Sequence, residues 1–323
     1  MNRLSSKYDD PFVYDDYDYD DRSRSSHRQS GNRKRKKEKQ KRTAVVAQLA
    51  DAQDSVTDWV PSYCANLDPK HHERTWVIKS IGPFYRDEIV TDVTRIVKGG
   101  KEANVYTCAA HPATGLEHIA AKLYRPRMLR HLKNDAIYKA GRTLRDANGK
   151  QIKGRREKLA LRKKTRFGKK VDIDWWIGNE FRSQQKLYEA GADVPQPIGH
   201  IGNTILMAHV GDDSGAAPTL SETGITTEEA QLLFERIMDN VALMLDNHLI
   251  HGDLSAYNIL YWEGEITIID FPQMIEARHN PHAFELLERD IQRVYDYFAR
   301  FGVEADSHEL TVGLWQPYMG RDH

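Results

Sequence analysis

The stretch HGDLSAYNIL, residues 251–260, carries polar side chains whose types and spacing could do chemistry. Asp253 lies two residues after His251, and Asn258 lies five residues after Asp253, directly before an apolar run. In phosphoryl transfer, an Asp of this kind accepts the proton of the acceptor hydroxyl, and an Asn five positions later holds a Mg²⁺ ion. A polar turn before a buried strand would give the same short pattern, so the interpretation depends on the rest of the chain.

A glycine turn earlier in the chain could hold the phosphates of a nucleotide. Phosphoryl transfer needs the triphosphate held, its charge neutralised and the acceptor aligned. In VKGGKEANVY, residues 97–106, Gly99 and Gly100 permit a close approach of the backbone, and Lys101 adds positive charge. The segment does not match G-x-G-x-x-G, and an ordinary hairpin turn is the alternative.

An apolar strand and a helix after this turn provide a candidate ion pair. Lys122 lies within HIAAKLY, where a buried charge is costly without a partner, and it could bind the α- and β-phosphates. Glu180 is expected to orient Lys122, because Trp176 and Leu187 place Glu180 near the inward edge of its helix. The alternatives are a snorkelling lysine at a sheet edge and a solvated glutamate.

A second candidate metal ligand follows another apolar run. Asp270 ends the run in EITIIDFPQ and lies twelve residues after Asn258, with one strand–turn–strand unit between them. Both residues should therefore lie at the same end of a hairpin, although an Asp that simply begins a turn is the alternative. The five features occur in the order that phosphoryl transfer from ATP requires, and together they predict an ATP-dependent enzyme.

The elements that must position these residues form two unlike halves. The predicted strands span residues 94–99, 103–109, 118–124, 197–201, 204–209, 258–262 and 266–269. The predicted helices span residues 44–52, 83–93, 172–190, 227–247 and 281–301, and their inward faces are expected to include Tyr188 and Leu232. A strand-rich half, a linker at 211–218 and a helical half predict an α+β, two-lobed fold like that of protein kinases.

The charged residues are distributed unevenly along the chain. Lys and Arg together number 47, as do Asp and Glu, so the net charge of zero indicates no class of partner. Residues 1–42 form an acidic and then a basic tail that we expect to be disordered, because it cannot bury enough apolar surface. A second basic stretch, at about 125–170, has fourteen Lys and Arg against two acidic residues between positions 139 and 170. We expect it to be a mobile insertion.

The remaining composition excludes several classes of protein. Cys64 and Cys108 are far apart and have no metal-ligand spacing, so we expect neither a disulfide framework nor a zinc site. No apolar run approaches the length of a membrane span, and the first residues lack an apolar signal core. We therefore expect a cytoplasmic protein without a membrane partner.

Several motifs together resemble the RIO family of atypical protein kinases, type-one branch. The motifs that carry the resemblance are GGKEANVY, AAKLY, HGDLSAYNIL, IIDFPQ and LERDIQRVYDYFARFG, and it runs from about residue 83 to about residue 306. The resemblance implies a kinase fold with a trimmed C-lobe, an extra helix before the N-lobe and a flexible loop before the first large helix. The chain would then divide into a tail (1–42), an N-terminal extension (43–82), an N-lobe (83–210) and a C-lobe (211–323).

The resemblance also implies a role for each candidate residue. Asp253 would be the catalytic base, and Asn258 and Asp270 would bind Mg²⁺ or Mn²⁺. Asp270 would also be a site of aspartyl phosphorylation, so that the protein acts as an ATPase switch as well as a serine kinase. The implied ATP-binding residues are Gly99, Gly100, Lys101, Val105, Lys122, Glu180, Met207 behind the adenine, and the backbone of Ala208 and Val210.

Some features of ordinary protein kinases are missing. No A-P-E stretch follows Asp270, and Ser255 occupies the position at which those kinases often have a phosphate-directed Lys. The sequence therefore indicates ATP use more strongly than it indicates an acceptor, which is either another protein or the chain itself.

Two other functions compete with this interpretation. Small-molecule phosphotransferases of the aminoglycoside or choline kinase type also use an HGDL loop, but GGKEANVY and the short C-terminal half argue against that class. An RNA or ribonucleoprotein binder would use the basic tail and the basic insertion on phosphate backbones. RIO proteins are associated with maturation of the small ribosomal subunit, so the resemblance implies rRNA or a pre-ribosomal particle as a partner.

Overall fold

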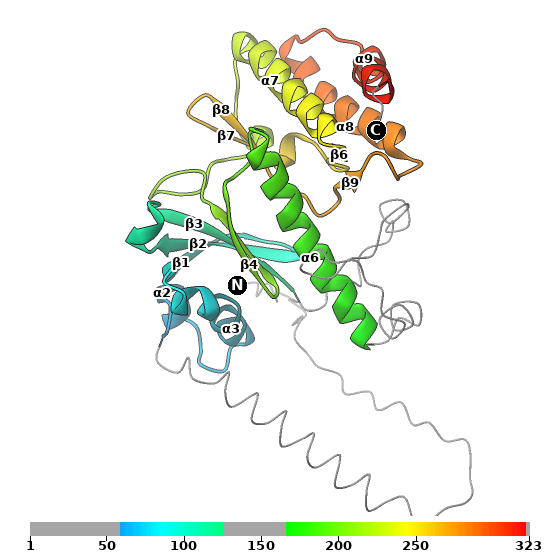
Figure 1. The fold of residues 1–323 in the computed structure, drawn as a ribbon. Helices are drawn as coiled ribbons and strands as arrows, with labels where there is room; N and C mark the ends of the chain where they lie inside the picture. Colours follow the sequence, from blue (N-terminus) through cyan, green and yellow to red (C-terminus); the bar gives the residue numbers. More distant parts are fainter. Residues whose placement is uncertain (1–58, 126–165, 321–323) are drawn as a thin grey trace, which may run out of the picture.

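The computed structural model of the protein describes residues 59–125 and 166–320. Its N-terminal part is a five-stranded antiparallel sheet in the order β1-β2-β3-β5-β4 (Figure 1). The strands are β1 (Val90–Gly99), β2 (Ala103–Ala110), β3 (His118–Tyr124), β4 (Pro197–Ile201) and β5 (Thr204–Ala208). The helices that accompany the sheet are α2 (Ser62–Ala65), α3 (His72–Arg86), the short η1 (Pro112–Thr114) and α6 (Arg166–Glu189).

The sheet is covered on both faces, and β3 lies at its centre. Ile119 and Leu123 of β3 pack in one cluster with Ile81 and Phe84 of α3. The side chains of a strand alternate between the two faces, so Lys122 points to the opposite face, on which α6 crosses the sheet (Figure 1). Every residue of β3 after the first is buried, which explains why HIAAKLY is apolar apart from Lys122.

The C-terminal part is mainly helical and has its own core (Figure 1). Its helices are η3 (Leu220–Glu222), α7 (Thr227–Asp246), η4 (Ala256–Asn258), α8 (Ala283–Phe298), η5 (Ala299–Phe301) and α9 (Ser307–Met319). Its strands form two small antiparallel sheets, β6 (Leu249–Ile250) with β9 (Ile275–Glu276) and β7 (Ile259–Trp262) with β8 (Glu265–Ile268). The predicted α+β arrangement of a sheet part and a helical part is confirmed.

The loop after α6 is bound tightly to the C-terminal part. Asp193 accepts two hydrogen bonds from the guanidinium of Arg236 on α7, at 2.6 and 2.7 Å. Asn240, also on α7, accepts from the Asp193 N–H at 2.7 Å and donates to its carboxylate at 2.6 Å. The Ile268 N–H of β8 donates to the Asp193 carbonyl at 2.7 Å. We call this set of contacts the Asp193 clasp.

Several predicted elements need correction. The helix predicted at 83–93 is wrong, because α3 spans His72–Arg86 with Pro83 inside it, and β1 begins at Val90. Glu88, between these two elements, has a φ of 54°, a left-handed conformation that ends the helix. Because β1 contains bulges, its buried residues do not alternate, and their spacing resembles that of a helix.

Other expectations are wrong in part or lie outside the described residues. Tyr188 and Leu232, expected on inward faces, are 42% and 69% exposed. The helix expected at 281–301 ends as the short η5, and α9 was not predicted. The tail at 1–42, the helix at 44–52 and most of the insertion at 125–170 lie outside the described residues, although positions 166–170 form the first turn of α6.

In the described part of the chain, no helix combines the length and the apolar composition that a membrane span requires.

Candidate functional site

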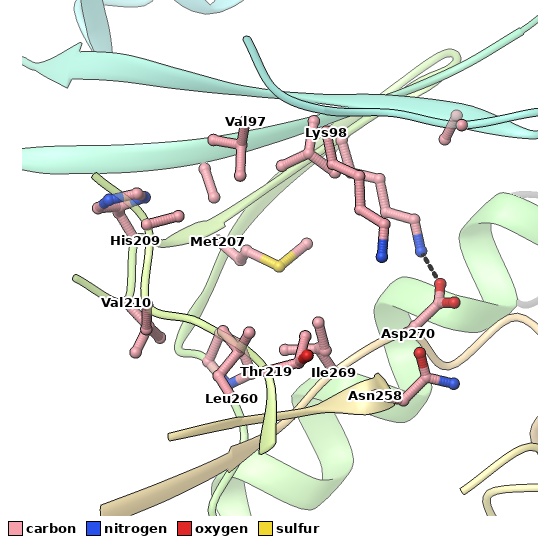
Figure 2. A pocket seen from close by; sticks show the side chains of 18 of the residues that line it. Val97, Lys98, Met207, His209, Val210, Thr219, Asn258, Leu260, Ile269 and Asp270 are labelled. Atoms are coloured by element: carbon pink, nitrogen blue, oxygen red, sulfur yellow. Dashed lines mark hydrogen bonds and ion pairs between the residues drawn. The ribbon is translucent and has the colours of Figure 1, made fainter. Parts of the chain in front are cut away.

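A cavity of about 920 Å³ lies between the sheet and the C-terminal part (Figure 2). Its walls come from β1, the glycine turn, β3, α6, the segment after β5, and the two ends of the β7–β8 hairpin. The candidate residues that line it are Gly100, Lys101, Val105, Lys122, Glu180, Met207, Ala208, Val210, Asn258 and Asp270. Gly99 and Asp253 do not belong to this lining.

Lys122 lies between two carboxylates inside the cavity. Its Nζ donates to Glu180 Oε1 at 2.7 Å and to Asp270 Oδ1 at 2.5 Å, and Figure 2 shows the second contact. The other carboxylate oxygen of Glu180 accepts a hydrogen bond from the Tyr124 hydroxyl. Glu180 is only 2% exposed, so these donors satisfy a carboxylate that water does not reach.

The three charged groups change one another's pKa. Burial lowers the pKa of Lys122, but the carboxylates of Asp270 and Glu180 outweigh burial and raise this pKa above its ordinary value. Burial raises the pKa of Glu180 to about 7, although Lys122 opposes the change. Burial also disfavours the Asp270 carboxylate, but Lys122 outweighs it and holds the pKa of Asp270 below its usual range. Lys122 and Asp270 are therefore both charged at neutral pH.

Asn258 and Asp270 lie beside each other at one end of the cavity (Figure 2). Pairing of β7 with β8 brings them together, and the Ile269 N–H donates to the Asn258 carbonyl at 2.9 Å. Asp270 has a φ of 74°, in the left-handed region, which Asp tolerates better than most residues. Such a conformation is often found where a side chain is held for function.

The oxygen atoms at this end suit a Mg²⁺ ion. Asn258 Nδ2 donates to the Asp253 carbonyl at 2.9 Å, which leaves the Asn258 amide oxygen as an acceptor beside the Asp270 carboxylate. In the described residues, no group of three or more His, Cys, Asp or Glu side chains could hold a metal ion alone. Mg²⁺ usually takes one or two protein oxygens and fills its other positions with water and phosphate oxygens. Asn258 and Asp270 fit that pattern.

Asp253 lies on the loop before Asn258 and has two side-chain partners. Arg293 of α8 donates to Asp253 Oδ1 at 2.7 Å, and Gln273 donates to Oδ2 at 3.4 Å. His251, which is buried, donates from Nε2 to the Ile269 carbonyl at 3.1 Å and accepts from the Asp253 N–H at Nδ1. Burial lowers the pKa of His251, so a neutral ring fits this pattern of one donor and one acceptor.

Backbone groups at the other end of the cavity could meet a nucleobase. The Ala208 N–H donates to the Gln196 carbonyl, and the Val210 carbonyl accepts from the Ala217 N–H, each at 2.8 Å. The Ala208 carbonyl and the Val210 N–H lie on the same segment and are the backbone groups that could meet a nucleobase. Figure 2 shows the Met207 side chain in the cavity between this edge and Asp270.

Comparison with known proteins decides the family. A family model described as "RIO domain" matches residues 104–310, which is more than half of the chain. The chain belongs to the RIO family. This confirms the predicted resemblance.

The curated relatives include both eukaryotic and archaeal RIO proteins. "Serine/threonine-protein kinase RIO1" of Chaetomium thermophilum is 35% identical over 228 residues, which cover 67% of this chain and 41% of that protein. The Homo sapiens protein of the same name is 32% identical, over 67% of this chain and 34% of that protein. "RIO-type serine/threonine-protein kinase Rio1" of Thermoplasma acidophilum is 31% identical, over 46% of this chain and 76% of that protein. The aligned part is thus less than half of either eukaryotic relative.

A solved structure also aligns with the fold. The Rio2 kinase from Chaetomium thermophilum aligns with 82% of this chain and 76% of its own, with a TM-score of 0.48 and 22% identity.

Sequence reasoning missed several residues that complete the site of this RIO chain. Gln273 and Arg293 hold Asp253, Lys98 of β1 points into the cavity, and Asp290 supports the loop that carries Asp253 (Figure 2 shows Lys98). Asp290 accepts from the N–H groups of Gly252 and Leu254 at 2.6 and 3.1 Å. The sequence did contain a signal for Asp290. This residue falls within the apolar stripe of α8, beside Leu287 and Ile291, where a buried charge needs partners.

We expect Asp290→Asn to lower the free energy of unfolding by about 1–3 kcal/mol, the cost of one unpaired buried polar group. Each oxygen of Asp290 accepts from a different backbone N–H, and an Asn offers only one acceptor oxygen. Urea denaturation of both proteins measures this difference, and Asp239→Ala on the exposed surface of α7 serves as the control. Equal stability of wild type and Asp290→Asn would contradict this role of Asp290.

The difference in the free energy of unfolding between wild type and Asp290→Asn should also depend on pH. Burial raises the pKa of Asp290 from 3.8 to about 7, although the two backbone N–H groups oppose the change. A raised pKa in the folded state gives stability that is complete below the unfolded pKa and is lost as pH rises through the folded pKa. The stability advantage of wild type over Asp290→Asn should therefore be larger at about pH 5 than at about pH 8. An advantage that grows with pH would contradict the raised pKa.

The two glycines of the turn differ in the space around them. The Gly100 N–H donates to the Ala103 carbonyl at 3.0 Å, which closes the turn. A Cβ on Gly100 would lie 2.7 Å from the Ala103 oxygen, whereas a Cβ on Gly99 would have its nearest neighbours at 3.9 Å. Of these two positions, only that of Gly100 has too little space for a side chain.

We expect Gly100→Ala to weaken ATP binding by about tenfold, because the turn must open to admit the new methyl group. Gly99→Ala is the matched control and should change ATP affinity by less than about twofold. Isothermal titration of both variants with ATP and Mg²⁺ measures the effect. Equal affinities in the two variants would show that the closed turn does not contribute to binding.

Proposed function

We propose that the chain is an ATP- and Mg²⁺-dependent phosphotransferase that acts as a RIO-type serine/threonine protein kinase or ATPase. The observation that carries the proposal is the placement of Lys122 between Glu180 and Asp270, with Asn258 beside Asp270, in one cavity of about 920 Å³. A cavity of this size suits a nucleotide. The names of the curated relatives, which are serine/threonine-protein kinases, support the same activity.

The residues take distinct roles in ATP binding. Lys122 would bind the α- and β-phosphates, and Glu180 would hold its ammonium group in place. The glycine turn, Gly99–Lys101, would close over the phosphates, with Val105 behind it. The base would lie against Met207 and meet the Ala208 carbonyl and the Val210 N–H. A bound Mg²⁺ or Mn²⁺ ion, held by Asn258 and Asp270, would neutralise charge on the phosphate oxygens.

Asp253 would serve the acceptor. Its carboxylate lies outside the cavity lining, where an acceptor hydroxyl could approach the γ-phosphate from the side of the C-terminal part. Arg293 and Gln273 hold it there. The carboxylate would take the hydroxyl proton as the oxygen bonds to phosphorus and ADP leaves. The acceptor would be a serine of another protein or of the chain itself.

The geometry also supports a second acceptor, the Asp270 carboxylate. It lies inside the cavity and is ionised, so it could attack the γ-phosphate directly, releasing ADP and forming an acyl phosphate. Hydrolysis of that bond would return the carboxylate and release inorganic phosphate. ATP turnover without a protein acceptor would follow, and the protein would act as a switch.

A ribosomal partner is a further part of the proposal. The basic runs at 22–42 and 139–170 carry charge suited to an RNA backbone, as in a pre-ribosomal particle. Binding of rRNA that weakens steeply with salt and disappears when both runs are deleted would support this partner. Binding that survives both deletions would refute it.

The decisive experiment uses γ-labelled ATP and Mg²⁺ with the full chain, beside Asp253→Ala and Asp270→Ala. Free phosphate, acid-stable phosphoserine and hydroxylamine-labile acyl phosphate are quantified separately. Phosphoserine that disappears in Asp253→Ala would establish a serine kinase. Free phosphate with an acyl phosphate that disappears in Asp270→Ala would establish an ATPase switch. If no product forms, the proposal fails, and small-molecule acceptors such as aminoglycosides or choline are the next to test.

A further inference from the structure

Asn104 is a buried polar residue directly after the glycine turn. It is 3% exposed and belongs to the GGKEANVY motif, yet it has no role in the function proposed above. A buried amide side chain must find partners for both its oxygen and its nitrogen. The partners that Asn104 finds connect two parts of the molecule.

The oxygen of Asn104 faces the turn. Asn104 Oδ1 accepts from the Gly100 N–H at 3.3 Å, the N–H that also closes the turn on the Ala103 carbonyl. The same oxygen accepts from Arg125, which follows β3, at 2.8 Å from Nη2 and 3.3 Å from Nε. Asn104 thus holds the closed turn through the Gly100 N–H. Through Arg125 it also links the turn to β3, the strand that carries Lys122.

The nitrogen of Asn104 faces α3. Asn104 Nδ2 donates to the Tyr106 hydroxyl at 3.0 Å and to Glu73 Oε1 at 3.4 Å. Glu73, in the first turn of α3, also accepts from the hydroxyls of Tyr106 at 2.6 Å and Tyr63 at 3.0 Å. Burial and the Glu73 carboxylate raise the pKa of Tyr63, and burial raises the pKa of Tyr106, so both hydroxyls remain protonated donors.

We infer that Asn104 is a positioning residue that holds the glycine turn over the nucleotide phosphates, and that Glu73 of α3 fixes Asn104 in turn. The amide of Asn104 donates to a carboxylate through Nδ2 and accepts from a backbone N–H through Oδ1 at the same time. Asp at this position would place a second carboxylate beside Glu73, and Leu would satisfy neither group. Helix α3, which precedes the sheet, therefore controls phosphate binding through Glu73, Asn104 and the glycine turn. The inference rests on the proposed nucleotide site.

The test compares a ligand that has phosphates with one that lacks them. Isothermal titration with Mg²⁺-ATP and with adenosine is performed on wild type, Asn104→Ala and Glu73→Gln. We expect Asn104→Ala to lose about tenfold in ATP affinity and less than about twofold in adenosine affinity, because only the phosphates meet the turn. Glu73→Gln, which keeps an acceptor oxygen but loses its charge, should lose about two- to fivefold for ATP alone.

Asn203→Ala is the matched control. Asn203 also joins α3 to the sheet, by donating to Ser80 Oγ and to the Tyr124 carbonyl at 3.1 Å each, but it does not touch the turn. Its removal should leave the ratio of ATP to adenosine affinity unchanged. A variant that loses structure in general would instead lose affinity for ATP and for adenosine alike.

The possible results separate this inference from the proposed function. Wild type that binds ATP no better than adenosine would overturn both, because no phosphate site would exist. Wild type that prefers ATP, with the same preference in Asn104→Ala, would overturn the inference alone. Equal losses for both ligands would also overturn it. If Asn104→Ala does not fold, the Glu73→Gln titration decides, since an unchanged ATP preference there removes α3 from the control of the turn.

Discussion

Asp253→Ala should lower the rate of phosphate transfer by a factor on the order of 10²–10⁴, the usual contribution of a general base, while ATP affinity changes by less than about threefold. ATP affinity should be retained because Asp253 does not line the cavity. The Asp253 and Arg293 side chains are 37% and 42% exposed, so loss of their ion pair should cost little stability. The fall in rate would therefore report on chemistry and not on folding.

Single-turnover transfer from γ-labelled ATP measures the rate of phosphate transfer, and isothermal titration measures ATP affinity. Asp239→Ala provides the control, since Asp239 is an exposed Asp on α7, away from the cavity. Asp253→Asn adds a variant of nearly the same shape that cannot accept a proton. Turnover equal to wild type in either Asp253 variant would show that another group is the base.

Asp270→Asn should remove the Mg²⁺ dependence of ATP binding and lower the affinity measured with Mg²⁺ by about 10–100-fold. The variant keeps the size of the side chain but loses the charged oxygen that would bind the ion. It also leaves Lys122 with Glu180 as its remaining carboxylate partner. Phosphate transfer should fall below detection, and no acyl phosphate should form.

Titration with ATP in Mg²⁺ and in EDTA measures this effect directly. Glu222→Gln is a suitable control, because Glu222 also lines the cavity but its carboxylate accepts from the N–H and hydroxyl of Thr219, at 3.0 Å each. That variant should keep the difference between Mg²⁺ and EDTA. An Asp270→Asn protein that still binds ATP more tightly with Mg²⁺ would place the metal ion elsewhere.

Features encoded locally were predicted most accurately. The strands at 118–124 and 197–201 agree with β3 and β4, because short runs of strand-forming residues between turn signals are a local pattern. The one charge in HIAAKLY predicted a carboxylate partner, and the structure places Glu180 against Lys122. The twelve-residue spacing of Asn258 and Asp270 likewise indicated a hairpin, which β7 and β8 form.

The side-chain partners of Asp253 and Asn104, which lie far away in the sequence, were not predicted. The partners of Asp253 lie 20 and 40 residues away on other elements, and Glu73 lies 31 residues before Asn104. For these pairs, neither the spacing nor the neighbouring residues contain a signal, since tertiary packing alone brings them together. The wrong helix at 83–93 has a different cause, because the bulges of β1 place buried residues at spacings that also suit a helix.

The Asp193 clasp has a mechanical consequence for the whole molecule. It ties the loop that follows α6 to α7 and β8 through an ion pair and three further hydrogen bonds, so these contacts oppose an outward movement of the C-terminal end of α6. Glu180 should therefore stay in place whether or not the cavity is filled. Small molecules whose binding requires α6 to move outward should therefore bind weakly, whereas ligands that fit the cavity as it stands should bind without moving this helix.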